Sequence, residues 1–264
     1  MSNTILSHLP SRPERPREHG LTMMMDKGIC LRQAEDFLSA SGHLADIIKL
    51  GFGTSLVSRQ VKEKVQLYHK AGMKVYVGGT LFEAFLIRND IEGYMRYIDD
   101  LGLDTVEVSD GSIQIEHKEK CKLIEQLAAK YRVVSEVGSK EAGILIAPAK
   151  WISMMKAELN AGSWKVIAEA RESGNVGIYR PNGTAHVVLV NRILSKVPSE
   201  SIIWEAPLKA QQAWFIKHIG SDVNLGNIAH DDVIPLETLR LGLRGDTFFQ
   251  FLPEELKKLK QTLA

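Results

Sequence analysis

Short runs rich in β-branched residues alternate with longer amphipathic stretches along nearly the whole chain. This alternation is typical of repeated strand–helix units, which build a parallel sheet covered by helices. We count eight such runs, at residues 20–25, 46–50, 74–77, 105–108, 132–136, 165–169, 202–205 and 223–225. Eight units followed by a last helix predict an α/β fold, a single (β/α)8 TIM barrel. A doubly wound open sheet is the alternative fold.

The chain length agrees with one barrel domain, because 264 residues is an ordinary size for this fold. We expect residues 1–18, which are rich in Pro and Arg, to form an irregular arm and residues 19–264 to form the barrel. The arm lacks the apolar core of a signal peptide, and no segment reaches eighteen uninterrupted apolar residues. With only two cysteines and no metal-finger spacing, these features predict a cytoplasmic protein that is not bound to a membrane.

The charge balance excludes some classes of partner. The chain carries 33 basic and 32 acidic residues, so its formal net charge is +1. Such a chain has no general attraction to nucleic acid or to an anionic membrane. The sequence also lacks GxGxxG and GxxxxGK[ST] elements, which argues against dinucleotide-binding dehydrogenases and P-loop kinases. Any anionic ligand must therefore be bound by a local group of residues.

Four of the expected strands carry a glutamate at their carboxyl end, namely Glu107, Glu136, Glu169 and Glu205. In a barrel of this type the active site is built at those ends. A carboxylate beside an apolar run is costly to bury unless it is compensated. Pairing with barrel lysines and arginines explains any single glutamate equally well, but four together favour a functional site.

Cations occupy further strand ends, at Lys27, Lys49, Lys140 and Arg171. Lysine and arginine side chains bind carboxylates, phosphates and other oxyanions. Carboxylates in the same place are suitable ligands for Mg²⁺, which prefers hard oxygen donors. The alternation of acids and bases around one rim therefore predicts a small and strongly anionic substrate.

Three glycine-containing segments fall where functional loops are expected. NLGNI at 224–228 is interpreted as a turn whose backbone N–H groups can hold a phosphate, although an ordinary turn is the simpler interpretation. GGTLFE at 78–83 allows close backbone approach to a ligand, with Thr80 and Glu83 as lesser candidates. GNVGIYRPNG at 174–183 interrupts the chain after the sixth strand, as a working loop would.

Longer motifs run through most of the chain. They are DKG at 26–28, KLGFGTS at 49–55, VEVSDGSI at 106–113, SEVGSKE at 135–141, ARESG at 170–174, WEAPLKAQQAWFIK at 204–217 and VIPLETLRLGLRGDT at 233–247. Together with GGTLFE and NLGNI, they resemble the phosphosulfolactate synthase family. Each motif alone is short, but their number makes the resemblance specific.

The resemblance implies a Mg²⁺-dependent barrel lyase that acts on phosphoenolpyruvate and sulfite. Sulfite adds to C3, C2 is then protonated, and the product is (2R)-2-phospho-3-sulfolactate. This is an early step towards coenzyme M or other sulfonates, and neighbouring enzymes determine which sulfonate is made. The resemblance also implies a homo-oligomer, with a trimer as the candidate assembly.

The resemblance and the chemistry together suggest roles for the acids. Glu107, Glu136 and Glu169 are candidate Mg²⁺ ligands, where the cation would act as a Lewis acid. Glu205 is assigned a supporting role in substrate binding. Lys140 is the candidate proton donor to C2, because neighbouring cations or partial burial lower the pKa of a lysine.

The remaining candidates would bind the anionic groups. Lys27, Lys49 and Arg171 are expected to hold sulfite and the phosphate or carboxylate, with Lys49 and Arg171 counted as catalytic. Gly226 and Asn227 would offer backbone donors at the phosphate end.

Two other functions are compatible with the same residues. One is a related enzyme acting on phosphoenolpyruvate or another enolate with a different nucleophile, since the rim itself does not specify sulfite. The other is a non-catalytic role, like that discussed for plant heat-stress-associated relatives, in which the protein acts through partners. The number of costly charges at the strand ends favours an enzyme.

Overall fold

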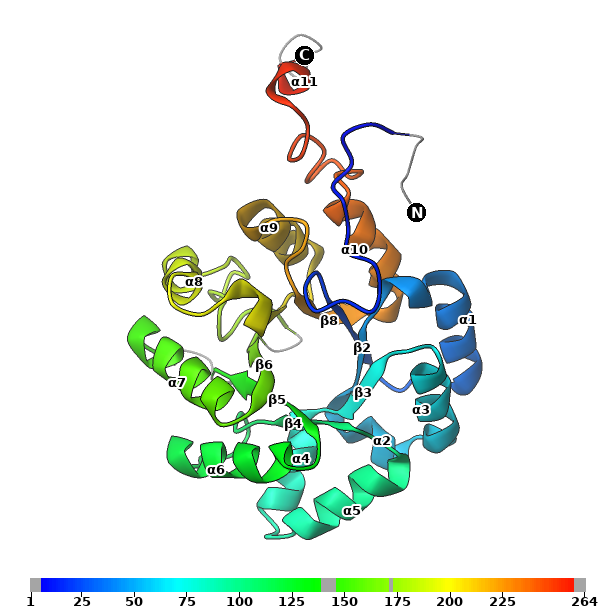
Figure 1. The fold of residues 1–264 in the computed structure, drawn as a ribbon, viewed down its shortest axis with the longest axis vertical. Helices are drawn as coiled ribbons and strands as arrows, with labels where there is room; N and C mark the ends of the chain where they lie inside the picture. Colours follow the sequence, from blue (N-terminus) through cyan, green and yellow to red (C-terminus); the bar gives the residue numbers. More distant parts are fainter. Residues whose placement is uncertain (1–5, 139–145, 171–172, 259–264) are drawn as a thin grey trace.

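The computed structural model describes residues 6–138, 146–170 and 173–258. Eight parallel strands curl into a barrel with helices on its outside (Figure 1). Their order around the sheet is β3-β2-β1-β8-β7-β6-β5-β4. The (β/α)8 barrel predicted from the alternating runs is therefore confirmed, and the doubly wound sheet is excluded.

The strands are short, as is usual for this barrel. They are β1 (Thr22–Asp26), β2 (Ile47–Leu50), β3 (Lys74–Val77), β4 (Thr105–Val108), β5 (Arg132–Val137), β6 (Ser163–Ala168), β7 (Ile202–Glu205) and β8 (Leu225–Ala229). The predicted boundaries of β3, β4 and β7 agree with the structure, and most of the others differ by one or two residues.

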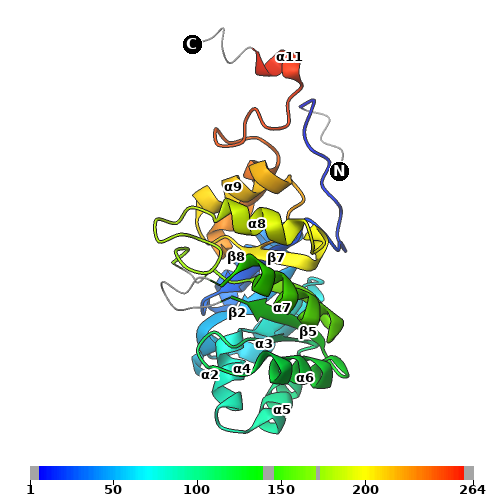
Figure 2. The ribbon, with the colours of Figure 1, turned by 90° about the vertical axis from the view of Figure 1, so that its left-hand side faces the viewer.

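Most of the helices cover the outer face of the barrel. They are α1 (Leu31–Ser41), α2 (Thr54–Val57), α3 (Val61–Lys70), α4 (Gly79–Leu86), α5 (Ile91–Leu101), α6 (His117–Ala128), α7 (Pro148–Asn160), α8 (Val187–Leu194), α9 (Lys209–Ile219), α10 (Val233–Arg240) and α11 (Glu254–Lys257). Figure 2 shows that α11 stands away from the barrel. Within the described ranges, every helix is too short or too polar to cross a membrane.

Alternation along the strands separates two apolar regions. The larger one lies between the sheet and the helices, and the smaller one includes Val134, Ile167 and Ile203 from β5, β6 and β7. Side chains two positions apart in a strand point to the same face. Glu136, Glu169 and Glu205 each follow one of these three residues by two positions. Their side chains therefore point into the barrel as well, one layer nearer the carboxyl ends of the strands.

The eighth strand corrects one prediction. It extends over Leu225–Ala229 instead of residues 223–225, so Gly226 and Asn227 lie in the strand and not in a phosphate-binding turn. A Cβ at Gly226 would collide with the end of Met23, which explains the glycine. The ladder with β1 shifts register here, and Asn227 has φ of 57°, which together indicate a β-bulge.

The N-terminal arm, described from residue 6, packs against the barrel without forming a helix or strand. Arg17 Nη2 lies 2.9 Å from Asp46 Oδ2, and both side chains are buried. Asp46 Oδ2 also accepts a hydrogen bond from the backbone N–H of Thr22. The arm is thus joined to the chain just before β2 and to the start of β1.

Replacing Arg17 with alanine is expected to lower the free energy of unfolding by about 3 kcal/mol, because the buried carboxylate of Asp46 loses its main charge partner. Denaturant titration measures the change. Arg96→Ala is the control, since this exposed arginine makes longer ion pairs of 3.6 and 3.8 Å and should change stability by less than about 0.5 kcal/mol. Equal effects of the two changes would contradict the prediction.

Candidate active site

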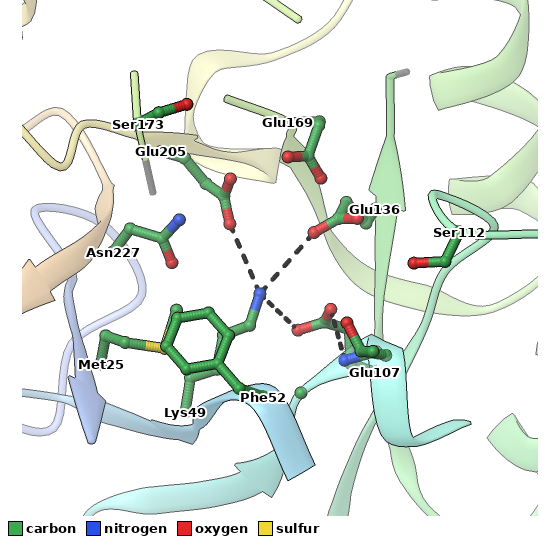
Figure 3. A pocket seen from close by; sticks show the side chains of 13 residues that line it. Met25, Lys49, Phe52, Glu107, Ser112, Glu136, Glu169, Ser173, Glu205 and Asn227 are labelled. Atoms are coloured by element: carbon green, nitrogen blue, oxygen red, sulfur yellow. Dashed lines mark hydrogen bonds and ion pairs between the residues drawn. The ribbon is translucent and has the colours of Figure 1, made fainter. Parts of the chain in front are cut away.

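A pocket of about 450 Å³ opens at the carboxyl ends of the strands (Figure 3). All four of the predicted strand-end glutamates line it, together with Lys49 and Asn227. The residue types and their location agree with the rim expected from the strand-end pattern. The structure therefore brings the predicted acids together in one cavity.

Lys49 lies at the centre of these acids. Its Nζ is 3.0 Å from Glu107 Oε2, 3.4 Å from Glu205 Oε1 and 3.7 Å from Glu136 Oε2. Burial lowers the pKa of Lys49, but the carboxylates around it raise the pKa more, so the net shift is well above the ordinary value. The lysine is therefore a permanent positive charge directed at protein carboxylates.

The glutamates divide into two groups. Carboxylate oxygens of Glu136, Glu169 and Glu205 lie within 4.8 Å of one another, and all three residues are buried. Glu107 lies in β4, and its Oε1 accepts a hydrogen bond of 2.8 Å from the backbone N–H of Gly79, the first residue of α4. The geometry thus groups Glu205, instead of Glu107, with Glu136 and Glu169.

Opposing electrostatic effects act on the pKa of Glu205. Its pKa is raised to about 7 as the net result of burial, which raises it most, the nearby charge of Lys49, which lowers it, and that of Glu136, which raises it. The backbone N–H of Ala170 donates to Glu205 Oε2 over 3.0 Å and favours the charged form. The carboxyl group is therefore close to the point at which it gains or loses a proton at neutral pH.

The described residues lining the pocket carry an excess of negative charge. They include four glutamates and Lys49 as the single lysine or arginine, which leaves three net negative charges when all are ionised. Buried like charges repel each other strongly. A hard divalent cation would relieve this repulsion, and three converging carboxylates are the donor type that Mg²⁺ prefers. The residues present therefore fit a bound Mg²⁺ ion.

The side chain of Asn227 was not anticipated as a pocket group. The bulge in β8 turns it towards the cavity, where its Oδ1 is buried and has no hydrogen-bond partner among the described residues. Buried polar atoms are normally satisfied, so this amide is suited to a ligand contact. The signal in the sequence was the asparagine itself, since Asn tolerates positive φ better than most residues.

The paired glycines at 78–79 have a steric explanation. A Cβ on Gly79 would collide with Glu107 and Ser109, so only glycine lets α4 begin this close to β4. Thr80 lines the pocket, as expected of a candidate. Glu83 does not line it, because its carboxylate accepts hydrogen bonds from the backbone N–H groups of Gly111 and Ser112 in the loop after β4.

The other predicted site residues either do not line the pocket or lie outside the described residues. Lys27 is exposed after β1 and is not among the residues that line the pocket. Gly226 faces Met23 inside the barrel and does not line it either. Lys140 and Arg171 lie outside the described residues, so their predicted roles stay predictions.

Sequence comparisons agree with the resemblance seen in the motifs. A sequence model of the (2R)-phospho-3-sulfolactate synthase (ComA) family matches residues 10–246. Phosphosulfolactate synthase from Methanothermobacter thermautotrophicus is 43% identical over 244 residues, covering 90% of this chain and 95% of the relative. Phosphosulfolactate synthase from Bacillus subtilis is 37% identical over 250 residues, covering 94% and 99%. Protein HEAT-STRESS-ASSOCIATED 32 from Arabidopsis thaliana is 22% identical over 260 residues, covering 87% and 88%.

Solved structures with similar folds are more distant in sequence. The 3-hexulose-6-phosphate synthase from Salmonella typhimurium has a TM-score of 0.52 and 16% identity, and the match covers 85% of this chain and 100% of that one. The YdjI aldolase from Escherichia coli K12 has a TM-score of 0.54 and 11% identity, with 81% and 76% covered. At these identities the likeness concerns the barrel fold alone.

Proposed function

Because the chain belongs to the (2R)-phospho-3-sulfolactate synthase family, whose members are enzymes that form a carbon–sulfur bond, we propose that it adds sulfite to phosphoenolpyruvate. The product would be (2R)-2-phospho-3-sulfolactate. The observation that best supports this proposal is the buried group of carboxylates around Lys49 at the carboxyl ends of the strands. A pocket of about 450 Å³ is of the size that proteins use for small molecules.

Both proposed substrates are anions, and the described residues that line the pocket carry an excess of negative charge, so a bound cation would favour substrate binding. We propose that Glu136, Glu169 and Glu205 hold Mg²⁺, while Glu107 pairs with Lys49. This changes the metal set expected from the sequence by placing Glu205 where Glu107 was predicted. When bound, Mg²⁺ would supply Lewis-acid stabilisation for negative charge on the substrate carboxylate.

The proposed reaction balances without any oxidant or leaving group. The sulfur lone pair of sulfite forms the new bond to C3, and the π electrons of the C2–C3 double bond move towards C2 and the carboxylate. A proton must then reach C2. Lys49 is poorly suited to donate it, because the surrounding carboxylates raise its pKa far above neutral pH. Lys140 therefore remains our proposed donor, with Arg171 as a proposed anion ligand.

In this mechanism Lys49 has an electrostatic role. Its ammonium group lies between Glu107, Glu205 and Glu136 and keeps their mutual repulsion small. Asn227 would contact the substrate with its side-chain amide, in place of the backbone turn predicted from the sequence. The pocket thereby combines a partly compensated group of acids with the neutral amide of Asn227.

The proposal is tested by incubating the purified protein with Mg²⁺, sulfite and phosphoenolpyruvate and analysing the products by mass spectrometry. A phosphorylated sulfonate is expected, with its formation dependent on all three components. Consumption of phosphoenolpyruvate without sulfite would favour another nucleophile. A folded protein that consumes neither substrate would contradict the proposal and favour a non-catalytic role.

Mg²⁺ binding is expected to weaken as the pH falls below about 7. The pKa of Glu205 is raised to about 7, chiefly by burial, so below that value the cation has to displace a proton from the carboxyl group. The apparent dissociation constant should rise by up to about tenfold per pH unit below 7 and change little above it. Titration calorimetry measures this, and Glu205→Gln should bind more weakly but with a flatter pH profile. An unchanged pH profile in Glu205→Gln would contradict the assignment.

A further inference from the structure

Two of the proposed metal ligands are held through their backbone by buried side chains from outside the sheet. The Oη of Tyr179 donates to the carbonyl oxygen of Glu205 over 2.7 Å. The Nζ of Lys120 donates to the carbonyl oxygen of Glu136. Each contact therefore acts on a residue whose carboxylate faces the pocket, although neither Tyr179 nor Lys120 lines the pocket itself.

We propose that Tyr179 and Lys120 are positioning residues, which fix the carboxyl ends of β7 and β5 so that Glu205 and Glu136 present their carboxylates to one cation. This inference rests on the proposed function. Neither residue was singled out from the sequence, because a tyrosine in a loop and a lysine in a helix carry no local sign of such a role.

Tyr179 belongs to the loop between β6 and α8, at residues 173–186. Its side chain is buried, and its ring packs edge-on against Phe215 with centroids 6.4 Å apart. Its hydroxyl group is the donor in the 2.7 Å hydrogen bond to Glu205. The packed ring holds this donor at the last residue of β7.

The same loop also holds the third glutamate. The backbone N–H of Ile178 donates to the carbonyl oxygen of Glu169 over 3.1 Å. Gly177 makes this approach possible, because it has φ of 64° and a Cβ there would collide with that carbonyl. One loop thus fixes the carboxyl ends of both β6 and β7. This loop therefore contributes to the spacing between Glu169 and Glu205, together with the pairing of β6 and β7.

Lys120 has the corresponding role for β5. This residue of α6 is fully buried, and its Nζ lies 2.9 Å from Asp110 Oδ1 and 3.0 Å from Glu158 Oε1. The two carboxylates keep the lysine charged, and a charged donor makes a stronger hydrogen bond to the carbonyl of Glu136 than a neutral one. Lys120 thereby links the end of β5 to the loop after β4 and to α7.

Groups that orient metal ligands affect the metal affinity even though they do not touch the metal. Their loss commonly weakens binding by about 10- to 100-fold. A residue with a purely structural role would change the melting temperature but would leave the affinity of the folded protein unaltered. A loss of Mg²⁺ affinity without a matching loss of melting temperature therefore distinguishes a positioning residue from one that only stabilises the fold.

Tyr179→Phe is the sharper test, because it keeps the ring against Phe215 and removes only the hydroxyl group. The dissociation constant for Mg²⁺, measured by titration calorimetry, should rise about tenfold with little change in melting temperature. Tyr131→Phe is the control, since it removes a hydroxyl group that donates to Asp99 Oδ1 over 2.9 Å and to the carbonyl oxygen of Met95 over 3.3 Å, on the outside of the barrel. This variant should bind Mg²⁺ like the wild-type protein.

Lys120→Met provides a second test and should also raise the dissociation constant for Mg²⁺ by about tenfold or more. If this variant does not fold, Tyr179→Phe decides alone. Wild-type affinity in a folded Tyr179→Phe protein would overturn the inference while leaving the proposed function intact. A wild-type protein that forms the sulfonate but binds no Mg²⁺ would overturn the metal site and this inference with it.

Discussion

The Lys49→Met protein is expected to lose at least about a thousandfold in kcat/KM for sulfite addition, which corresponds to about 4 kcal/mol of transition-state stabilisation. Lys49 is the cation that Glu107, Glu205 and Glu136 share at 3.0 to 3.7 Å. Without it the buried carboxylates repel one another and take up protons, so they no longer present the charges that the site requires. Sulfite-dependent consumption of phosphoenolpyruvate measures the loss.

Two comparisons separate this effect from simple unfolding. Removing one partner from a buried group of charges also destabilises the fold, so the melting temperature of Lys49→Met has to be measured beside its activity. Lys62→Met is the control, because Lys62 is an exposed lysine that pairs with Asp100 at 2.6 Å on the outside of the barrel. It should keep wild-type turnover. A folded Lys49→Met protein with near wild-type turnover would remove Lys49 from the mechanism.

The second large effect is expected for Glu169→Gln. The amide keeps the size of the side chain but carries no negative charge, so the dissociation constant for Mg²⁺ should rise by at least about 100-fold. Turnover at low Mg²⁺ should fall in parallel and recover in part at high Mg²⁺. Glu169 is the most informative position, because the ion pairs of Lys49 run to the other three glutamates and are preserved in this variant.

The matched control is another buried glutamate far from the pocket. Glu237 pairs with Arg12 at 2.9 Å on the side of the barrel where the N-terminal arm packs. Glu237→Gln is expected to lower stability but to leave Mg²⁺ affinity unchanged. Equal Mg²⁺ affinity in Glu169→Gln and the wild-type protein would contradict the assignment of Glu136, Glu169 and Glu205 as metal ligands.

The barrel could be predicted from the sequence because its signals are local. A strand such as Lys74–Val77 or Ile202–Glu205 is a short β-rich run between helical patterns, and both were predicted with the boundaries that the structure shows. The strand-end glutamates were found from the same local pattern, because each lies at or beside the end of one of these runs.

The extent of the eighth strand could not be predicted in this way. Glycine and asparagine in NLGNI are turn-forming residues, so the local pattern favoured a turn. In the barrel, β8 pairs with both β7 and β1, and these ladders hold the segment extended despite its composition. The side chain of Met23, which is more than 200 positions away in the sequence, is what makes a glycine necessary at 226.

The sequence by itself therefore determined the type of fold, the family and which acids stand at the strand ends, because alternation and motif content are properties of neighbouring residues. Only the tertiary structure decided how those acids divide. Glu107 contacts Lys49 and the start of α4, whereas Glu136, Glu169 and Glu205 converge from three adjacent strands. The distances between side chains on different strands depend on how the barrel closes, and the linear order of residues does not contain that information.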